Sequence, residues 1–66
     1  MLHYYRNAAG TKIGYTRQLG PHIYGYLMNG ARVAYYWPQL DITYLPGGER
    51  VGYGNMLPGL ILQAAR

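Results

Sequence analysis

Three copies of a six-residue motif constrain the fold of this 66-residue chain more than any other feature. The motif is Gly, any residue, a cation, a β-branched aliphatic residue, a tiny residue and Tyr. Its copies occupy residues 10–15, 30–35 and 48–53, at steps of 20 and 18 residues. Because self-similarity at a fixed period of about 20 residues or more is typical of repeat architectures, the sequence predicts three similar structural units.

Each unit has the pattern of a β-hairpin. Asn29-Gly30 and Gly47-Gly48 each lie between two runs that have the alternating pattern of β-strands, which favours two-residue turns with positive φ. Ala8-Ala9-Gly10 favours a three-residue loop that ends in a left-handed Gly with a bulge. The strand pairs that follow are His3 with Tyr15, Tyr4 with Gly14, Tyr5 with Ile13, Tyr24 with Tyr35, Gly25 with Ala34, Tyr26 with Val33, Ile42 with Tyr53, Thr43 with Gly52 and Tyr44 with Val51.

The predicted fold is all-β: a single domain, 1–66, in which three hairpin repeats form an antiparallel meander of six short strands. The repeats span about 2–17, 22–37 and 41–56. Pro-containing turns separate them, because Pro lacks the donor that a central strand needs. Residues 57–66 form a C-terminal cap. Their Leu, Gln, Ala and Arg content favours a short helical turn, with a seventh strand as the alternative.

Alternation along the strands gives the sheet two unlike faces. We call one the Tyr-rich face, and its predicted members are Tyr5, Ile13, Tyr15, Tyr24, Tyr26, Met28, Val33, Tyr35, Trp37, Ile42, Tyr44, Val51 and Tyr53. We call the other the thin face, and its predicted members are Arg6, Lys12, Arg32, Arg50, Tyr4, Tyr36, Gly14, Gly25, Ala34, Thr43, Gly52 and Gly54. The cap has too few apolar residues for the Tyr-rich face, so we expect a curled sheet or a second subunit to cover it.

Few stabilising devices other than oligomerisation are open to so short a chain. A core of this size supplies about 3–5 kcal/mol, and the absence of Cys excludes disulfides and thiolate metal sites. The remaining potential metal ligands show no recognised spacing, so no metal and no cofactor is expected. We therefore expect a non-enzymatic binding or assembly module that forms a homo-oligomer. Its predicted interface residues are Tyr15, Tyr24, Tyr26, Tyr35, Trp37, Tyr44 and Tyr53.

The third unit, Gly-Gly-Glu-Arg-Val-Gly-Tyr-Gly at 47–54, resembles the core of MORN repeats, which are short hairpins that stack into an elongated, curved sheet. Residues 29–35 match more loosely, and the first unit matches through Gly10, Lys12, Gly14 and Tyr15. The repeat spacing is shorter than in that family, and its flanking acidic residues are absent. The resemblance implies a scaffold for protein association or lipid headgroup contact.

The cations suggest a second function. Lys12, Arg32 and Arg50 occupy equivalent motif positions, and Arg6 adds to the row. With Tyr4 and Tyr36 available to stack on bases, they form a candidate strip for nucleic-acid phosphate, a lipid headgroup or an acidic protein. The alternative is that these cations only keep the sheet from aggregating.

Catalysis is not expected, because Ser and Cys are absent and no Thr has an evident base nearby. A ligand or catalytic site at the axis of an oligomer stays open as a third hypothesis. The start of the chain lacks the apolar region of a signal peptide, and the longest apolar run, 60–62, is too short to span a bilayer. A cytoplasmic location is expected.

Overall fold

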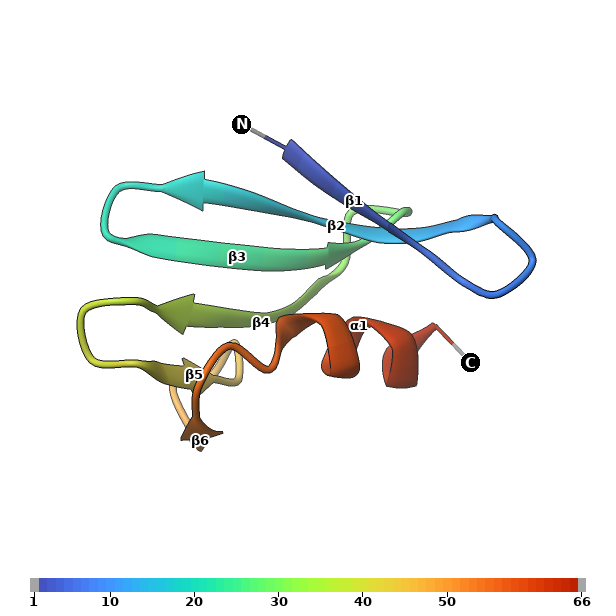
Figure 1. The fold of residues 1–66 in the computed structure, drawn as a ribbon. Helices are drawn as coiled ribbons and strands as arrows, with labels where there is room; N and C mark the ends of the chain where they lie inside the picture. Colours follow the sequence, from blue (N-terminus) through green and yellow to red (C-terminus); the bar gives the residue numbers. More distant parts are fainter. Residues whose placement is uncertain (1, 66) are drawn as a thin grey trace.

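The computed structural model describes residues 2–65 as a six-stranded sheet and one helix (Figure 1). The elements are β1 (Leu2–Arg6), β2 (Lys12–Leu19), β3 (His22–Leu27), β4 (Arg32–Trp37), β5 (Ile42–Tyr44), β6 (Arg50–Tyr53) and α1 (Leu57–Ala64). Each strand pairs with the next, so the sheet order is β1-β2-β3-β4-β5-β6. The predicted all-β meander of hairpins with a short C-terminal cap is confirmed, and the cap is a helix.

All three hairpins close with the same three-residue loop. Gly30 N donates to Leu27 O at 2.9 Å and Leu27 N donates to Ala31 O at 2.9 Å, while Gly30 has φ 90°. Equivalent bonds join residues 7–11 and 45–49. The loop predicted for the first unit is therefore confirmed. The two-residue loops predicted for the other units are wrong, because only the last loop residue has positive φ.

A second irregularity lies in every return strand, at the β-branched residue of the motif. Tyr26 pairs with Arg32 and Gly25 with Ala34, so Val33 is an extra residue that bulges from β4. Ile13 and Val51 occupy the same place in β2 and β6. The predicted pairs Ile13 with Tyr5, Val33 with Tyr26 and Val51 with Tyr44 are therefore wrong.

The bulge decides which of the other predicted pairs hold. In the second and third units the loop is one residue longer than predicted, and the bulge adds one residue to the return strand. The two differences cancel, so Tyr24–Tyr35, Gly25–Ala34, Ile42–Tyr53 and Thr43–Gly52 pair as predicted. In the first unit the predicted loop length is correct, so the unpredicted bulge at Ile13 shifts the register of the following pairs by one residue. Tyr4 consequently pairs with Tyr15, Tyr5 with Gly14 and His3 with Thr16. This shift moves Tyr4 to the Tyr-rich face and Tyr5 to the thin face.

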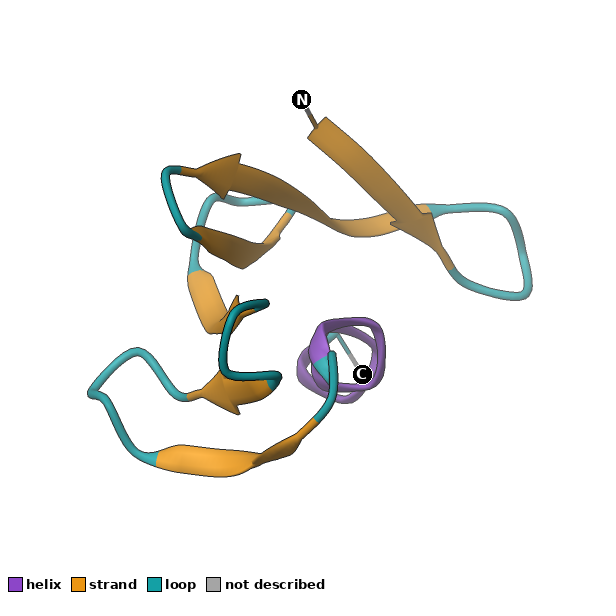
Figure 2. Cartoon of the chain, turned by 60° about the vertical axis from the view of Figure 1, so that its left-hand side comes forward, coloured by secondary structure: helices purple, strands orange, loops and turns teal. Residues whose placement is uncertain are grey.

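Helix α1 packs against the thin face, and the sheet curves around it (Figure 2). Leu57 and Ile61 lie one turn apart and are fully buried, beside fully buried Ala34. A Cβ added at Gly25 would lie 3.3 Å from the Leu57 side chain, and one at Gly14 would lie 2.5 Å from that of Ile61. The tiny motif residues Gly14 and Ala34, together with Gly25 of β3, thus make room for the helix.

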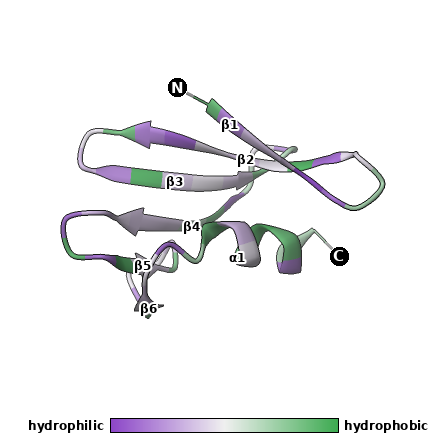
Figure 3. Cartoon of the chain, viewed as in Figure 1, coloured by the Kyte–Doolittle hydropathy of each residue, from purple (hydrophilic) through white to green (hydrophobic). Residues whose placement is uncertain are grey.

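This packing corrects the expectation that the thin face is open. The part of this face formed by Gly14, Gly25 and Ala34 lets a helix approach closely, and the apolar residues of α1 (Figure 3) cover it. None of the described residues forms a helix that is long and apolar enough to cross a membrane.

Thr43 fixes the start of α1 against the sheet. Its buried Oγ1 accepts a hydrogen bond from Met56 N at 3.0 Å and donates one to Gly54 O at 2.7 Å. Asn55 Oδ1 accepts from Leu57 N at 3.0 Å, which satisfies one of the free donors of the first turn. Pro58 follows in the first turn, where its missing N–H is not needed.

Candidate binding face

Six tyrosine rings form a continuous row on the Tyr-rich face, from β1 to β5. We call this row the tyrosine ladder, and its members in order are Tyr4, Tyr15, Tyr26, Tyr24, Tyr35 and Tyr44. Successive ring centroids are 5.8, 5.1, 6.5, 5.6 and 5.2 Å apart. These distances lie within the range of favourable aromatic pairs, so the rings form one connected surface.

The repeat explains the ladder. The last motif residue of one unit stacks on the first strand of the next: Tyr15 on Tyr26 at 19° between ring planes, and Tyr35 on Tyr44 at 18°. These residues are direct cross-strand partners in the register. Because each such pair contributes about 0.5–1.5 kcal/mol beyond area burial, the stacking also joins neighbouring hairpins.

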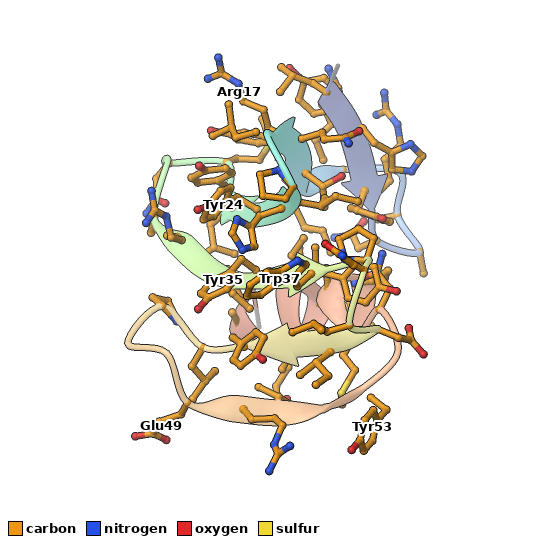
Figure 4. The ribbon with its side chains drawn as sticks, turned by 90° about the vertical axis from the view of Figure 1, so that its left-hand side faces the viewer. Arg17, Tyr24, Tyr35, Trp37, Glu49 and Tyr53 are labelled. Atoms are coloured by element: carbon orange, nitrogen blue, oxygen red, sulfur yellow. The ribbon has the colours of Figure 1, made fainter. Side chains whose placement is uncertain are left out.

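His22 and Trp37 widen the ladder beside β3 and β4. The His22 ring lies 4.7 Å from Trp37 and 5.4 Å from Tyr35, both edge-on. Figure 4 shows Tyr24, Tyr35 and Trp37 gathered on the same part of the sheet. Trp37 Nε1 is buried without a hydrogen-bond partner among the described residues. As the single Trp of the chain, this residue is a natural optical reporter for the face.

The cations lie on the Tyr-rich face rather than on the thin face. Lys12 Nζ is 4.4 Å from the Tyr4 ring centroid, and the Arg32 guanidinium carbon is 4.7 Å from that of Tyr24. The prediction that they lie opposite the tyrosines is wrong because of the bulge, which re-aims the side chain next to it. Cationic and aromatic side chains therefore share one surface.

Register places the other described cations on the same side. Arg6 pairs with Lys12, Arg17 with Tyr24 and Arg50 with Tyr44. Arg6 Nη1 also donates to the carbonyl of its own loop at 2.9 Å. Alternation from Tyr15 also predicts this side for Arg17, although the predicted cation row does not include it. Five cations thus lie over or beside the tyrosine ladder.

Tyr36 lies apart from this group. It is on the thin face as predicted, across from Thr43, and its hydroxyl donates to Asp41 Oδ1 at 2.6 Å. That hydrogen bond, with smaller contributions from desolvation and from the Asp41 charge, raises the pKa of Tyr36. Tyr36 thus has no place among the cations, although it was predicted to act with them.

The ladder is accessible. Helix α1 lies on the opposite side of the sheet, and the rings of Tyr15, Tyr24, Tyr35 and Tyr44 are half-buried by one another. Tyr53 stands apart at the β6 end with 74% of its surface exposed. The described residues enclose no pocket and form no group of three potential metal ligands.

Comparisons of the chain with family models, curated proteins and solved structures find no match. The resemblance of residues 47–54 to MORN repeats therefore stays a prediction from the motif.

Proposed function

We propose that this protein is a non-enzymatic module that binds single-stranded nucleic acid on the Tyr-rich face. The observation that carries the proposal is the placement of Lys12 and Arg32 over rings of the tyrosine ladder. Proteins that bind single strands combine cations along the phosphate backbone with aromatic rings on which bases stack. Here both groups occur on one surface.

The chemistry of the face matches such a ligand. Stacking of a base on an aromatic side chain contributes about 1–3 kcal/mol and tolerates any base. Arg32 lies over Tyr24 and within 5.9 Å of Tyr26. Its guanidinium can therefore pair with a phosphate while the neighbouring rings meet the bases. The absence of a pocket among residues 2–65 is consistent with a strand laid across the sheet.

The distribution of charge also supports an anionic ligand. The sequence has a pI of about 9.6, which is in the range of nucleic-acid-binding domains. Asp41 is hydrogen-bonded to Tyr36, away from the ladder, and Glu49 lies in the loop of the third hairpin. Two copies joined face to face would bring their cations together, and like charges in an interface oppose association.

Fluorescence anisotropy with a 5′-labelled oligothymidylate of about 12 nucleotides tests the proposal, since known site sizes are about 4–16 nucleotides. We expect binding at low salt, quenching of Trp37, and an affinity that falls as salt rises. For single strands the slope of log K against log salt is about −0.7 for each phosphate neutralised, so five cations give about −3.5.

Two results would contradict the proposal: no binding at about 50 mM salt, or an affinity independent of salt. Labelled poly-glutamate is the second probe. Tighter binding of poly-glutamate than of the oligonucleotide would show that the face recognises an acidic protein instead. A duplex of the same sequence should bind more weakly than the single strand, because its bases are already stacked.

A second copy of the chain is the other candidate occupant of this face. The observation in its favour is the half-buried tyrosine ladder, which no second layer within residues 2–65 covers. A standard interface buries about 800 Å² on each partner, against 4332 Å² for the whole molecule. Light scattering that gives a dimer mass, with Trp37 emission shifted to the blue on dimerisation, would favour this occupant.

A further inference from the structure

His22 packs among the aromatic groups of the Tyr-rich face, next to the turn between β2 and β3. Its ring centroid lies 4.7 Å from that of Trp37, 5.4 Å from that of Tyr35 and 6.0 Å from that of Tyr24. The contacts with Trp37 and Tyr35 are edge-on, and His22 is half-buried. Three rings from two strands therefore hold the imidazole beside the tyrosine ladder, while part of its surface stays open to solvent.

A cation is the diagonal neighbour of His22 across the β2–β3 pair. His22 pairs with Leu19 of β2. Arg17 precedes Leu19 by two residues, so its side chain leaves the sheet on the same face as His22. Residues in this diagonal relation lie about 7–8 Å apart, which is within reach of a long side chain, and Arg17 is exposed. One phosphate can therefore contact the Arg17 guanidinium and the His22 ring at the same time.

Three strands supply the groups that face His22, because α1 lies on the other side of the sheet. These groups are Arg17 and Leu19 on β2, Tyr24 on β3, and Tyr35 and Trp37 on β4. Arginine and tyrosine side chains keep their charge states between pH 5 and 8, whereas histidine is the type of side chain that ordinarily gains a proton in this range. The imidazole is therefore the pH-sensitive type of group in this part of the face.

The acidic residues are placed elsewhere. Asp41 is hydrogen-bonded to Tyr36 on the thin face, and Glu49 lies in the loop of the third hairpin. The sequence contains no other Asp or Glu. Neither carboxylate faces His22, so within residues 2–65 a protonated ring at this position has no anionic side chain beside it. A phosphate of a bound strand would supply that anion.

We infer, on the basis of the function proposed above, that protonated His22 is a phosphate-binding residue of the nucleic-acid site and that binding is coupled to uptake of a proton from solvent. A phosphate beside the ring stabilises the charged imidazolium. By linkage, protonation strengthens phosphate binding to the same extent. Affinity therefore rises as the pH falls through the range in which histidine is protonated, and it is lower above that range.

One further cation changes the salt dependence by a predictable amount. Each neutralised phosphate of a single strand contributes about −0.7 to the slope of log K against log salt. The slope of about −3.5 from five cations should therefore become about −4.2 at about pH 5.5, where His22 is the sixth. In about 0.1 M salt, the same contribution makes the affinity roughly fivefold higher at about pH 5.5 than at about pH 7.5.

Anisotropy titrations with the labelled oligothymidylate at these two pH values test the coupling. Thymine and phosphodiester groups do not titrate between them, so a change in affinity arises in the protein. His22→Gln keeps a polar side chain without the titratable ring, and it should lose most of the pH response and keep a slope of about −3.5 at both values. His3→Gln is the matched control, because His3 packs edge-on against Tyr5 on the thin face. It should respond to pH as the wild type does.

The ring signals of the two histidines give a second measurement, on the wild-type chain. When they are followed by NMR against pH, the titration midpoint of His22 should move to higher pH in the presence of the oligothymidylate. The midpoint of His3 should stay in place. A His22 that only packs against Trp37 would not show this difference, because a structural contact does not depend on the ligand.

Three results would overturn the inference and leave the proposed function standing. The first is an oligothymidylate that binds with equal affinity and salt slope at the two pH values. The second is a pH response that His22→Gln retains in full. The third is a midpoint of His22 that the ligand leaves unchanged. Absence of binding at both pH values in about 50 mM salt would overturn the proposed function together with this inference, so the two failures are distinguishable.

Discussion

The two faces of the sheet are built by consecutive residues of one motif and behave as opposites. Ala34 is fully buried under α1, while Tyr35 is part of the open tyrosine ladder. On the thin face the small residues Gly14, Gly25 and Ala34 allow α1 to pack closely, and on the Tyr-rich face large side chains meet mainly each other. Substitutions on the thin face should therefore change stability, and those on the Tyr-rich face should change binding.

Ile61→Ala should have the largest effect. Ile61 is fully buried against the thin face, and truncation of such a residue costs about 2–5 kcal/mol. That is as large as the ~3–5 kcal/mol a core of this size supplies, so the variant should be mostly unfolded at 25 °C. Urea denaturation followed by circular dichroism measures the change. Leu62→Ala, at a 44% exposed neighbour, should cost far less, and equal losses would contradict the packing of α1.

Gly14→Ala should also destabilise, by the opposite mechanism. The added Cβ would lie 2.5 Å from both Ile61 Cγ2 and the Tyr26 carbonyl oxygen, and overpacking of this kind costs about 1–3 kcal/mol. The control is Gly25→Ala, whose Cβ would lie 3.3 Å from Leu57 Cδ2, 3.4 Å from Ile61 Cδ1 and 3.6 Å from the Ala34 carbonyl oxygen, so its neighbours need to move far less. If the two variants unfold at the same urea concentration, α1 does not approach the sheet as closely as described.

Tyr24→Leu should weaken oligonucleotide binding with a smaller effect on folding. Loss of one stacked base corresponds to about 1–3 kcal/mol, or roughly 5- to 150-fold in affinity. Tyr36→Leu makes the same change on the thin face and should leave anisotropy titrations unaltered. An equal loss of affinity in both variants would show that the two faces do not differ in ligand binding.

Arg32→Gln should have the smallest effect. It removes one phosphate contact, so the magnitude of the salt slope should fall by about 0.7 and the affinity by roughly tenfold or less. Arg32→Lys keeps the charge and should restore the slope. If the salt slope of Arg32→Gln equals that of the wild type and of Arg32→Lys, Arg32 does not contact a phosphate.

The sequence predicted the parts of the fold that depend on local turns and alternation. The three-residue loop that ends in Gly10 was predicted correctly, and so was the pairing of Gly25 with Ala34. The bulge at Val33 was not predictable from the pattern, because a β-branched residue in a bulge looks like any other strand residue. The extra residues Ile13 and Val33 also explain why the faces of Tyr4 and Arg32, respectively, were assigned wrongly.

The position of the helix was missed for a different reason. The apolar residues of the cap were weighed against the large Tyr-rich face, where they are too few. Gly14, Gly25 and Ala34 are the signal for the correct face, because a row of tiny residues across strands is a surface that a helix can approach. Most of the ladder was predicted, since alternation is preserved outside the bulges.

An NMR titration with the oligothymidylate tests most directly whether the Tyr-rich face is the binding site. We expect shifts to concentrate on the ring and side-chain signals of Lys12, Tyr24, Arg32, Tyr35 and Trp37. The amides of the thin face and the methyl groups of α1 should stay in place. Shifts centred on α1 or on the thin face, or no shifts at millimolar ligand, would contradict the claim that the Tyr-rich face is the binding site.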